Sequence, residues 1–111
     1  MNDTTIQFER SDVWIFLSVA AAAGAGGRPV PLDSIISAAD YVNHAIPTEL
    51  ELEGGLTRLL QAGLVREDRR CFGLTETGAA LSGRARLRSP TLRKQWETVR
   101  ENLKKGPFPK V

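Results

Sequence analysis

The sequence predicts a mostly α-helical chain with a small β-hairpin and an added C-terminal helix. Residues 48–78 have the pattern of a capped amphipathic helix, a short hairpin and the start of another helix. An apolar segment at residues 12–23 has the length of a core helix. With 111 residues, the chain has room for one compact domain, which we expect to span residues 1–111.

Charge is distributed unevenly along the chain. Residues 1–83 hold 6 basic and 11 acidic residues, a net charge of −5, whereas residues 84–111 hold 9 basic and 2 acidic residues, a net charge of +7. Such a basic segment favours attraction to a polyanion or to the acidic part of a second copy. No apolar run reaches the ~20 residues of a membrane span. The polar N-terminus does not resemble a secretion signal, so we expect no membrane association and a cytoplasmic location.

The first helix is expected at about residues 12–23, with Ser11 as its N-cap. Its apolar residues fall on both sides, with Trp14 on one face and Phe16 on the other. A helix that is apolar all round is normally buried on all sides. Because one small domain rarely covers such a helix completely, we expect a second subunit. The following "GAGGRPVP" lacks a P-loop lysine and predicts a flexible, partly extended connection rather than a phosphate site.

A second helix is expected from residue 32 or 33 to about residue 41–43. The turn "NHAIP" follows it, because the residue before Pro47 is pushed out of the helical region. His44 lies in this turn without a nearby cysteine or carboxylate partner in the pattern, so a surface or capping role is expected rather than a metal ligand.

The third helix opens with a capping box in which Thr48 is the cap and Glu51 stands three positions later. Gly63 ends the helix, and residues 64–67 and 71–74 are expected to pair as a hairpin with residues 68–70 at its tip. Thr75 then suits the N-cap of the next helix. One side of the third helix is expected to face the core through Leu52, Leu56, Leu59 and Leu60.

The segment "LLQAGLVRE…FGLTETGAAL" resembles the "GLV … Y-x-L-T-x-x-G" signature of PadR-like and MarR-like winged-helix regulators. In the order of its elements the resemblance covers residues 12–83, and in recognisable residues it covers positions 56–81. It implies a winged helix-turn-helix core at residues 11–83 and a small DNA-binding protein that regulates transcription. The implied partner is double-stranded DNA.

In a helix-turn-helix the second helix meets base edges in the major groove, and the wing contacts phosphates or the minor groove. The resemblance therefore implies that the residues in contact with the major groove are Thr48, Glu51, Gly54, Thr57, Arg58 and Gln61. It implies that Arg66, Arg69 and Arg70 of the wing contact phosphates or the minor groove. Glutamates crowd the start of the predicted reading helix, and phosphates repel them. The alternative is a winged-helix protein-interaction module without DNA affinity.

A C-terminal helix is predicted at residues 89–105, with Ser89 as its cap. Its apolar residues are spaced 4, 3 and 4 apart, as in a narrow heptad seam. A helix of about 15 residues is marginal alone in water, so it must dock on something. The resemblance implies a homodimer, while docking on its own domain is the alternative. The predicted dimer interface consists of Trp14, Leu92, Trp96, Val99 and Leu103.

Catalysis finds no support in the sequence, which has no nucleophile elbow and no zinc-protease motif. We therefore expect neither an enzyme nor catalytic residues, and no cofactor or metal. Cys71 is the single cysteine, so an intramolecular disulfide is excluded. On a strand it would usually pack, and a role as an oxidant sensor is the alternative.

Overall fold

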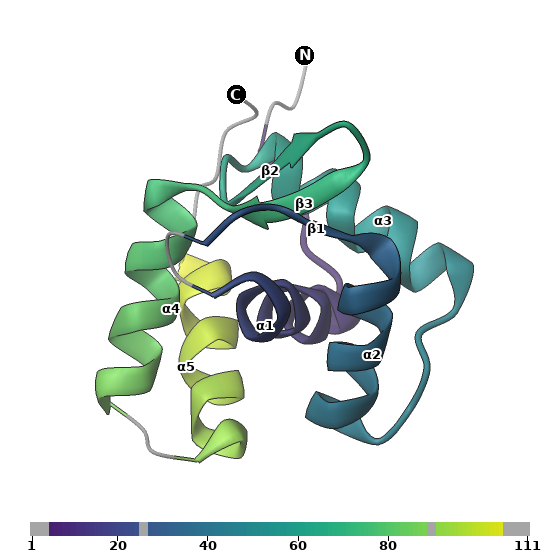
Figure 1. The fold of residues 1–111 in the computed structure, drawn as a ribbon. Coiled ribbons are helices and arrows are strands. Elements are labelled where there is room, and N and C mark those ends of the chain that lie inside the picture. Colours follow the sequence, from purple (N-terminus) through teal and green to yellow (C-terminus); the bar gives the residue numbers. More distant parts are fainter. Residues whose placement is uncertain (1–4, 25–26, 89–90, 106–111) are drawn as a thin grey trace.

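The computed structural model describes residues 5–24, 27–88 and 91–105. This part of the chain forms five helices and a three-stranded antiparallel sheet (Figure 1). The elements are α1 (Arg10–Ala23), β1 (Val30–Pro31), α2 (Leu32–Asn43), α3 (Glu49–Gln61), β2 (Val65–Asp68), β3 (Cys71–Leu74), α4 (Glu76–Arg88) and α5 (Leu92–Lys105). The prediction of a mostly helical chain with a small hairpin is confirmed.

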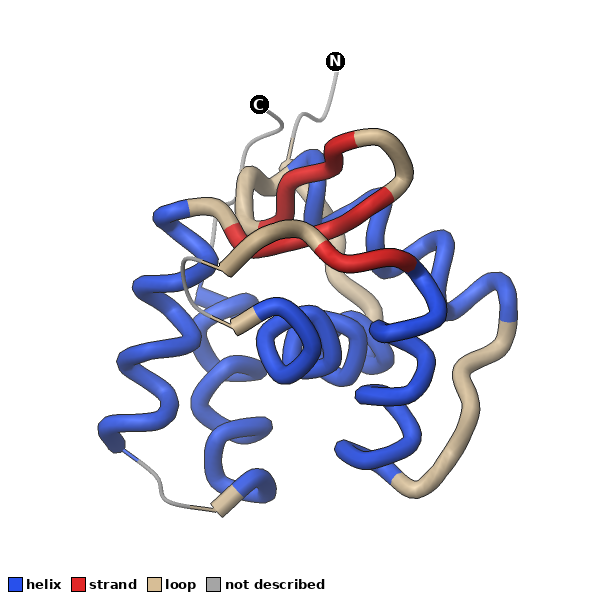
Figure 2. The backbone as a smooth tube through the Cα atoms, in the orientation of Figure 1, coloured by secondary structure: helices blue, strands red, loops and turns tan. Residues whose placement is uncertain are grey.

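The sheet contains one strand more than the sequence predicted. Its order is β1-β3-β2, so β3 pairs with β2 on one side and with β1 on the other (Figure 2). Val30 lies opposite Phe72, and Pro31 lies opposite Cys71. A proline cannot donate a backbone hydrogen bond, and β1 is an edge strand, where this defect is tolerated. The extended stretch predicted near residue 30 is therefore part of the sheet.

Helix α1 lies at the centre of the molecule, where it is surrounded by other elements (Figure 1). Every residue from Asp12 to Val19 is buried. Helices α2, α3, α4 and α5 and strand β3 all contact α1 within one chain. The expected burial on all sides is confirmed for residues 12–19, and the cover comes from this chain, so the burial of α1 does not itself call for a second subunit. Four helices and a sheet strand from this chain are sufficient.

The start of α1 differs from the prediction. Glu9, not Ser11, is the N-cap, and it forms a reciprocal capping box with Asp12. The Glu9 N–H donates to Asp12 Oδ2 at 2.8 Å, and the Glu9 side chain accepts from the Asp12 N–H. Such a box satisfies two of the N–H groups that the beginning of a helix leaves without partners. Asp12 is consequently fixed at the N-terminal end of the core helix.

The hairpin is joined to α4 by a close backbone contact. Gly63 has a φ of +73° and ends α3, as predicted. The Thr75 hydroxyl donates to the Gly63 carbonyl at 2.5 Å and accepts from the Gly78 N–H at 3.0 Å, so Thr75 caps α4 and ties it to the end of α3. A Cβ on Gly78 would lie 2.0 Å from the Leu64 carbonyl oxygen. The glycines and the threonine of "GLV…LTETG" therefore act together to bring α4 against the start of the hairpin.

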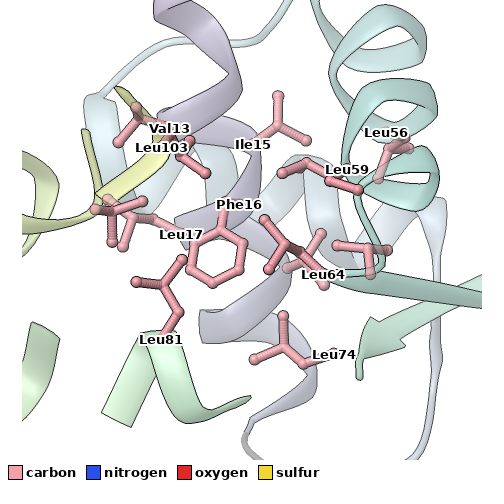
Figure 3. Close-up of a cluster of buried hydrophobic side chains, with 14 of the residues drawn as sticks. Val13, Ile15, Phe16, Leu17, Leu56, Leu59, Leu64, Leu74, Leu81 and Leu103 are labelled. Atoms are coloured by element: carbon pink, nitrogen blue, oxygen red, sulfur yellow. The ribbon is translucent and has the colours of Figure 1, made fainter. Parts of the chain in front are cut away.

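The hydrophobic core surrounds Phe16, which is fully buried (Figure 3). Leu59 of α3, Leu64 before β2 and Leu81 of α4 point into the same cluster. The leucine side of α3 that the sequence predicted therefore faces the core. Its opposite side is left to the surface.

Glycine substitutions in α4 test the close contact. We expect Gly78→Ala to lower the free energy of unfolding by about 2 kcal/mol, because the new methyl group would collide with backbone. Gly83→Ala in the same helix is the matched control, because a Cβ there meets no atom within 4 Å. The free energy of unfolding of this control should rise by about 1 kcal/mol, because alanine has the higher helix propensity. Urea unfolding of both variants measures the difference. Equal effects would show that the contact with Leu64 is not tight.

Candidate functional site

The outward side of α3, the predicted reading helix, is acidic and apolar. Its exposed residues are Glu49, Leu50, Glu53 and Thr57. Leu50 has 85% of its surface exposed. The exposed face offers two carboxylates and no cation, so it would repel a phosphate backbone.

Arg58, the one cation of α3, points away from this face towards α1. Its Nε donates to Asp12 Oδ2 at 2.6 Å, and its Nη2 donates to Asp12 Oδ1 at 2.9 Å. Asp12 is fully buried, whereas the Arg58 side chain is 25% exposed. The hydrogen bond to Asp12 raises the pKa of the Arg58 guanidinium, against the opposing effect of its burial. A two-pronged pair with a buried carboxylate occupies the donors that base reading would need.

Two glycines of α3 make room for this ion pair. A Cβ on Gly55 would lie 2.9 Å from Ile15 and 3.3 Å from Asp12 Oδ1. A Cβ on Gly54 would lie 3.0 Å from a guanidinium nitrogen of Arg58. The close approach that the two glycines suggest is thus an approach of α3 to α1 and to its own arginine.

The other predicted reading residues also make contacts within the chain. Thr48 and Glu51 form the expected capping box, in which the Thr48 N–H donates to Glu51 Oε1 at 2.8 Å and the Glu51 N–H donates to Thr48 Oγ1 at 3.1 Å. Gln61 is half-buried at the end of α3. Of the six residues assigned to the groove, Thr57 is left as an exposed side chain without a hydrogen bond among the described residues.

The tip of the β2–β3 hairpin presents two exposed arginines. Arg69 and Arg70 form the two-residue turn, with φ angles of +51° and +66°. Asn-Gly or a similar pair normally occupies such a turn, because other side chains are strained at positive φ. Arg66, the third predicted wing residue, donates instead to the carbonyls of Leu74 at 3.3 Å and Gly27 at 3.4 Å. Arg66 therefore bonds to the backbone of its own chain, whereas the exposed side chains of Arg69 and Arg70 can contact a ligand.

The structure divides the predicted dimer residues into two groups. Trp14 is 5% exposed, and its indole N–H donates to the Ala39 carbonyl at 2.9 Å. Val99 is fully buried and Leu103 is 6% exposed, because α5 packs on α1 and α4 of the same chain. These three side chains are buried within one chain, so they offer little surface to a second copy in this arrangement. Leu92 and Trp96 retain exposed surface.

Helix α5 is also shorter than predicted in the described part of the chain. It begins at Leu92, and the Thr91 hydroxyl accepts from the Lys94 N–H at 3.3 Å in the manner of a cap. The predicted cap, Ser89, lies outside the described residues.

Large exposed apolar side chains lie at the end of the molecule away from the sheet. This end is formed by the end of α2, the α2–α3 connection, the end of α4 and the start of α5 (Figure 1). We call it the apolar end and define it by Tyr41, Leu87 and Leu92, which lie in the last turns of α2 and α4 and at the first residue of α5. Tyr41 is 69% exposed and Leu87 is 90% exposed. Ile46 in the α2–α3 connection and Leu50 at the start of α3 are also exposed, by 72% and 85%. Sequence analysis did not single out Tyr41, Leu50 and Leu87, because each lies off the periodic apolar face of its helix.

A shallow hollow of about 340 Å³ lies between the end of α2 and the start of α5. Val42 lines it on one side, and Leu92 and Trp96 line it on the other. Asp40 precedes it on α2, and Arg93 and Lys94 lie on α5. The lining of the hollow also includes Arg93 and Glu97, both on α5.

The remaining residues that sequence analysis singled out are His44 and Cys71. In the described residues no three histidine, cysteine or carboxylate side chains are grouped to hold a metal ion. His44 is exposed and is the C-cap of α2, where it has the left-handed backbone conformation. This agrees with the surface or capping role expected for it. Cys71 is a half-buried free thiol on β3. No helix in the described ranges is both long and apolar enough to cross a membrane.

Comparison with family models, curated proteins and solved structures finds no match to this chain. Its function is therefore inferred from the residues on its surfaces.

A double-mutant cycle tests the structural role of Arg58. We expect Arg58→Ala to lower the free energy of unfolding by roughly 3 kcal/mol, because it leaves a buried carboxylate without its partner. Asp12→Ala combined with Arg58→Ala should cost less than the two single changes added together, by about 1–3 kcal/mol. Denaturant unfolding of the four proteins measures this coupling.

Arg66→Ala is the control for the cycle, since Arg66 bonds only to backbone carbonyls and should contribute less than ~1.5 kcal/mol. If Arg58→Ala leaves the free energy of unfolding unchanged and sharply lowers the affinity for DNA, Arg58 contacts bases and has no structural role.

Proposed function

We propose that this chain is a winged-helix protein-interaction module that pairs with a second copy through its apolar end. The observation that carries this proposal is that the ends of α2 and α4 and the start of α5, which carry the exposed side chains of Tyr41, Leu87 and Leu92, lie at one end of the molecule (Figure 1). Scattered apolar residues are normal on a protein surface, but a concentration rimmed by polar groups marks an interaction site. The β2–β3 hairpin corresponds to the wing, and α2 and α3 correspond to the helix-turn-helix.

Charge differs between the two sides of the apolar end. Asp40 lies at the end of α2, whereas Arg86 and Arg88 at the end of α4 and Arg93 and Lys94 at the start of α5 outnumber Glu97. Under two-fold symmetry, the α2 side of one copy can face the basic side of the other, and the reverse. Leu92 and Trp96, two residues of the predicted dimer interface, line the hollow.

The charge of α3 argues against a conventional reading helix. Base-reading helices supply cations and amides to the major groove. Here the exposed face of α3 supplies Glu49 and Glu53, and Arg58 is bound to Asp12. A protein surface tolerates this face, whereas DNA repels it.

DNA binding through the wing is the second candidate, and one observation favours it. Arg69 and Arg70 occupy positive-φ turn positions that asparagine and glycine would fill with less strain. Backbone strain of this kind concentrates at functional positions. Two exposed arginines at a wing tip would contact phosphates or enter the minor groove.

Light scattering tests the pairing. We expect about twice 12.1 kDa at micromolar concentration for the unmodified chain. The variant Tyr41→Glu/Leu92→Glu should give the monomer mass, because it places carboxylates in the apolar contact. Thr77→Glu/Ala80→Glu is the matched control at exposed positions of α4, and it should remain paired. A monomeric unmodified chain would contradict the second copy as partner, and an unaffected Tyr41/Leu92 variant would place the contact elsewhere.

DNA titration across a salt series tests the second candidate. We expect weak binding to random duplex DNA, with a logarithmic salt slope that Arg69→Asn/Arg70→Gly reduces by about 2. The same variant should gain about 1–2 kcal/mol of stability, since it relieves the turn. Stability and DNA affinity thus move in opposite directions.

Arg86→Gln/Arg88→Gln is the control for the titration. It removes two charges at the end of α4, away from the hairpin (Figure 1). If it reduces the slope equally, the attraction is diffuse and the wing is not the contact. An absence of binding at low ionic strength would eliminate the second candidate altogether.

A further inference from the structure

A groove of about 640 Å³ lies between residues 5–10 and the C-terminal half of α5. It is separate from the apolar end and from the tip of the hairpin. The apolar part of its lining comes from the half-buried Phe8 and from the nearly buried side chains of Ile6, Val13 and Leu103. Val13 and Leu103 lie next to each other where α1 meets α5 (Figure 3). The volume falls within the range of small-molecule sites, roughly 300–1,000 Å³.

Cations border this apolar lining. Arg10 comes from the start of α1, and Arg100 and Lys104 come from α5. All three are exposed, and none has an ion-pair partner among the described residues. The groove also includes Glu9 and Lys105, so its ionisable lining carries a net charge of +3. The Glu9 carboxylate accepts the Asp12 N–H in the capping box, which further reduces its ability to neutralise these cations.

Helix electrostatics explain only part of this arrangement. Cations are favourable in the last turn of a helix, which accounts for Lys104 and Lys105. Arg10 lies in the first turn of α1, where the helix dipole opposes a positive charge. Arg100 stands before the last turn of α5 and faces the same groove. Cations from two helices that meet over an apolar floor are the arrangement that binds a molecule with an anionic head and an apolar body.

We propose that this groove binds a small amphipathic anion, with a carboxylate or a similar anionic group held by Arg10, Arg100 and Lys104 and an apolar chain packed on Phe8 and on the exposed edges of Ile6 and Leu103. The head would form charge-assisted hydrogen bonds at the rim, and the chain would remove apolar surface from water. Neither interaction depends on the pairing of two copies or on DNA.

Calorimetric titration of the full chain with decanoate, below its micellar concentration, tests the proposal. We expect saturable binding of one decanoate per chain. Decanol and decylamine should bind at least tenfold more weakly, because they lack the anionic head, and acetate should do so because it lacks the apolar chain. Arg100→Gln/Lys104→Gln should weaken decanoate binding at least tenfold.

Arg93→Gln/Lys94→Gln is the matched control, since it removes the same charge from the same helix outside the groove. It should change the affinity for decanoate less than twofold. Equal losses in the two variants would overturn the site, as would equal binding of decanoate and decanol. Binding to vesicles of phosphatidylglycerol without binding to soluble decanoate would also overturn it, in favour of a lipid surface.

Discussion

The complete burial of α1 is the constraint on which the rest of this structure depends. A helix that is apolar on all sides must be covered all round, and here α2, α3, α4, α5 and β3 all pack against it. Covering it requires α5, which removes Val99 and Leu103 from the surface. It also requires that the one carboxylate within the buried stretch, Asp12, find a partner, because an unpaired charge in a core is strongly unfavourable. Arg58 is that partner, so the demands of the core determine what α3 can offer to a ligand.

From this constraint follows a molecule with distinct surfaces. The leucine side of α3 and its arginine face inward, which leaves glutamates and Leu50 outside. The helix ends opposite the sheet carry the exposed apolar residues, and the hairpin tip carries two arginines in a strained turn. A fourth surface, the groove beside residues 5–10, combines exposed cations with a partly apolar lining. The charge asymmetry along the chain thus becomes a spatial separation, in which Asp40 on α2 and the cations of α4 and α5 lie on different sides of the apolar end.

Features with local causes were predictable from the sequence, and features that depend on distant residues were not. The Thr48–Glu51 box, the end of α3 at Gly63 and the cap at Thr75 follow from residues within a few positions of one another. The pair of Arg58 and Asp12 joins residues 46 positions apart, and no local pattern announces it. The family resemblance assigned Arg58 to the DNA groove, but its long side chain reaches back to Asp12 of α1 next to Gly54 and Gly55. The third strand was missed because a two-residue edge strand with a proline has no periodicity.

We propose that the apolar end, defined by Tyr41, Leu87 and Leu92, is the contact surface of this protein, rather than the outer face of α3 or the wing. Hydrogen–deuterium exchange of the unmodified chain at low and high protein concentration tests it most directly, because exchange reports where pairing protects the backbone. The account predicts that slower exchange at high concentration is concentrated at residues 41–50 and 92–97, while the hairpin at residues 65–74 is unchanged. Concentration-dependent protection of the hairpin, with residues 41–50 and 92–97 unaffected, would contradict it.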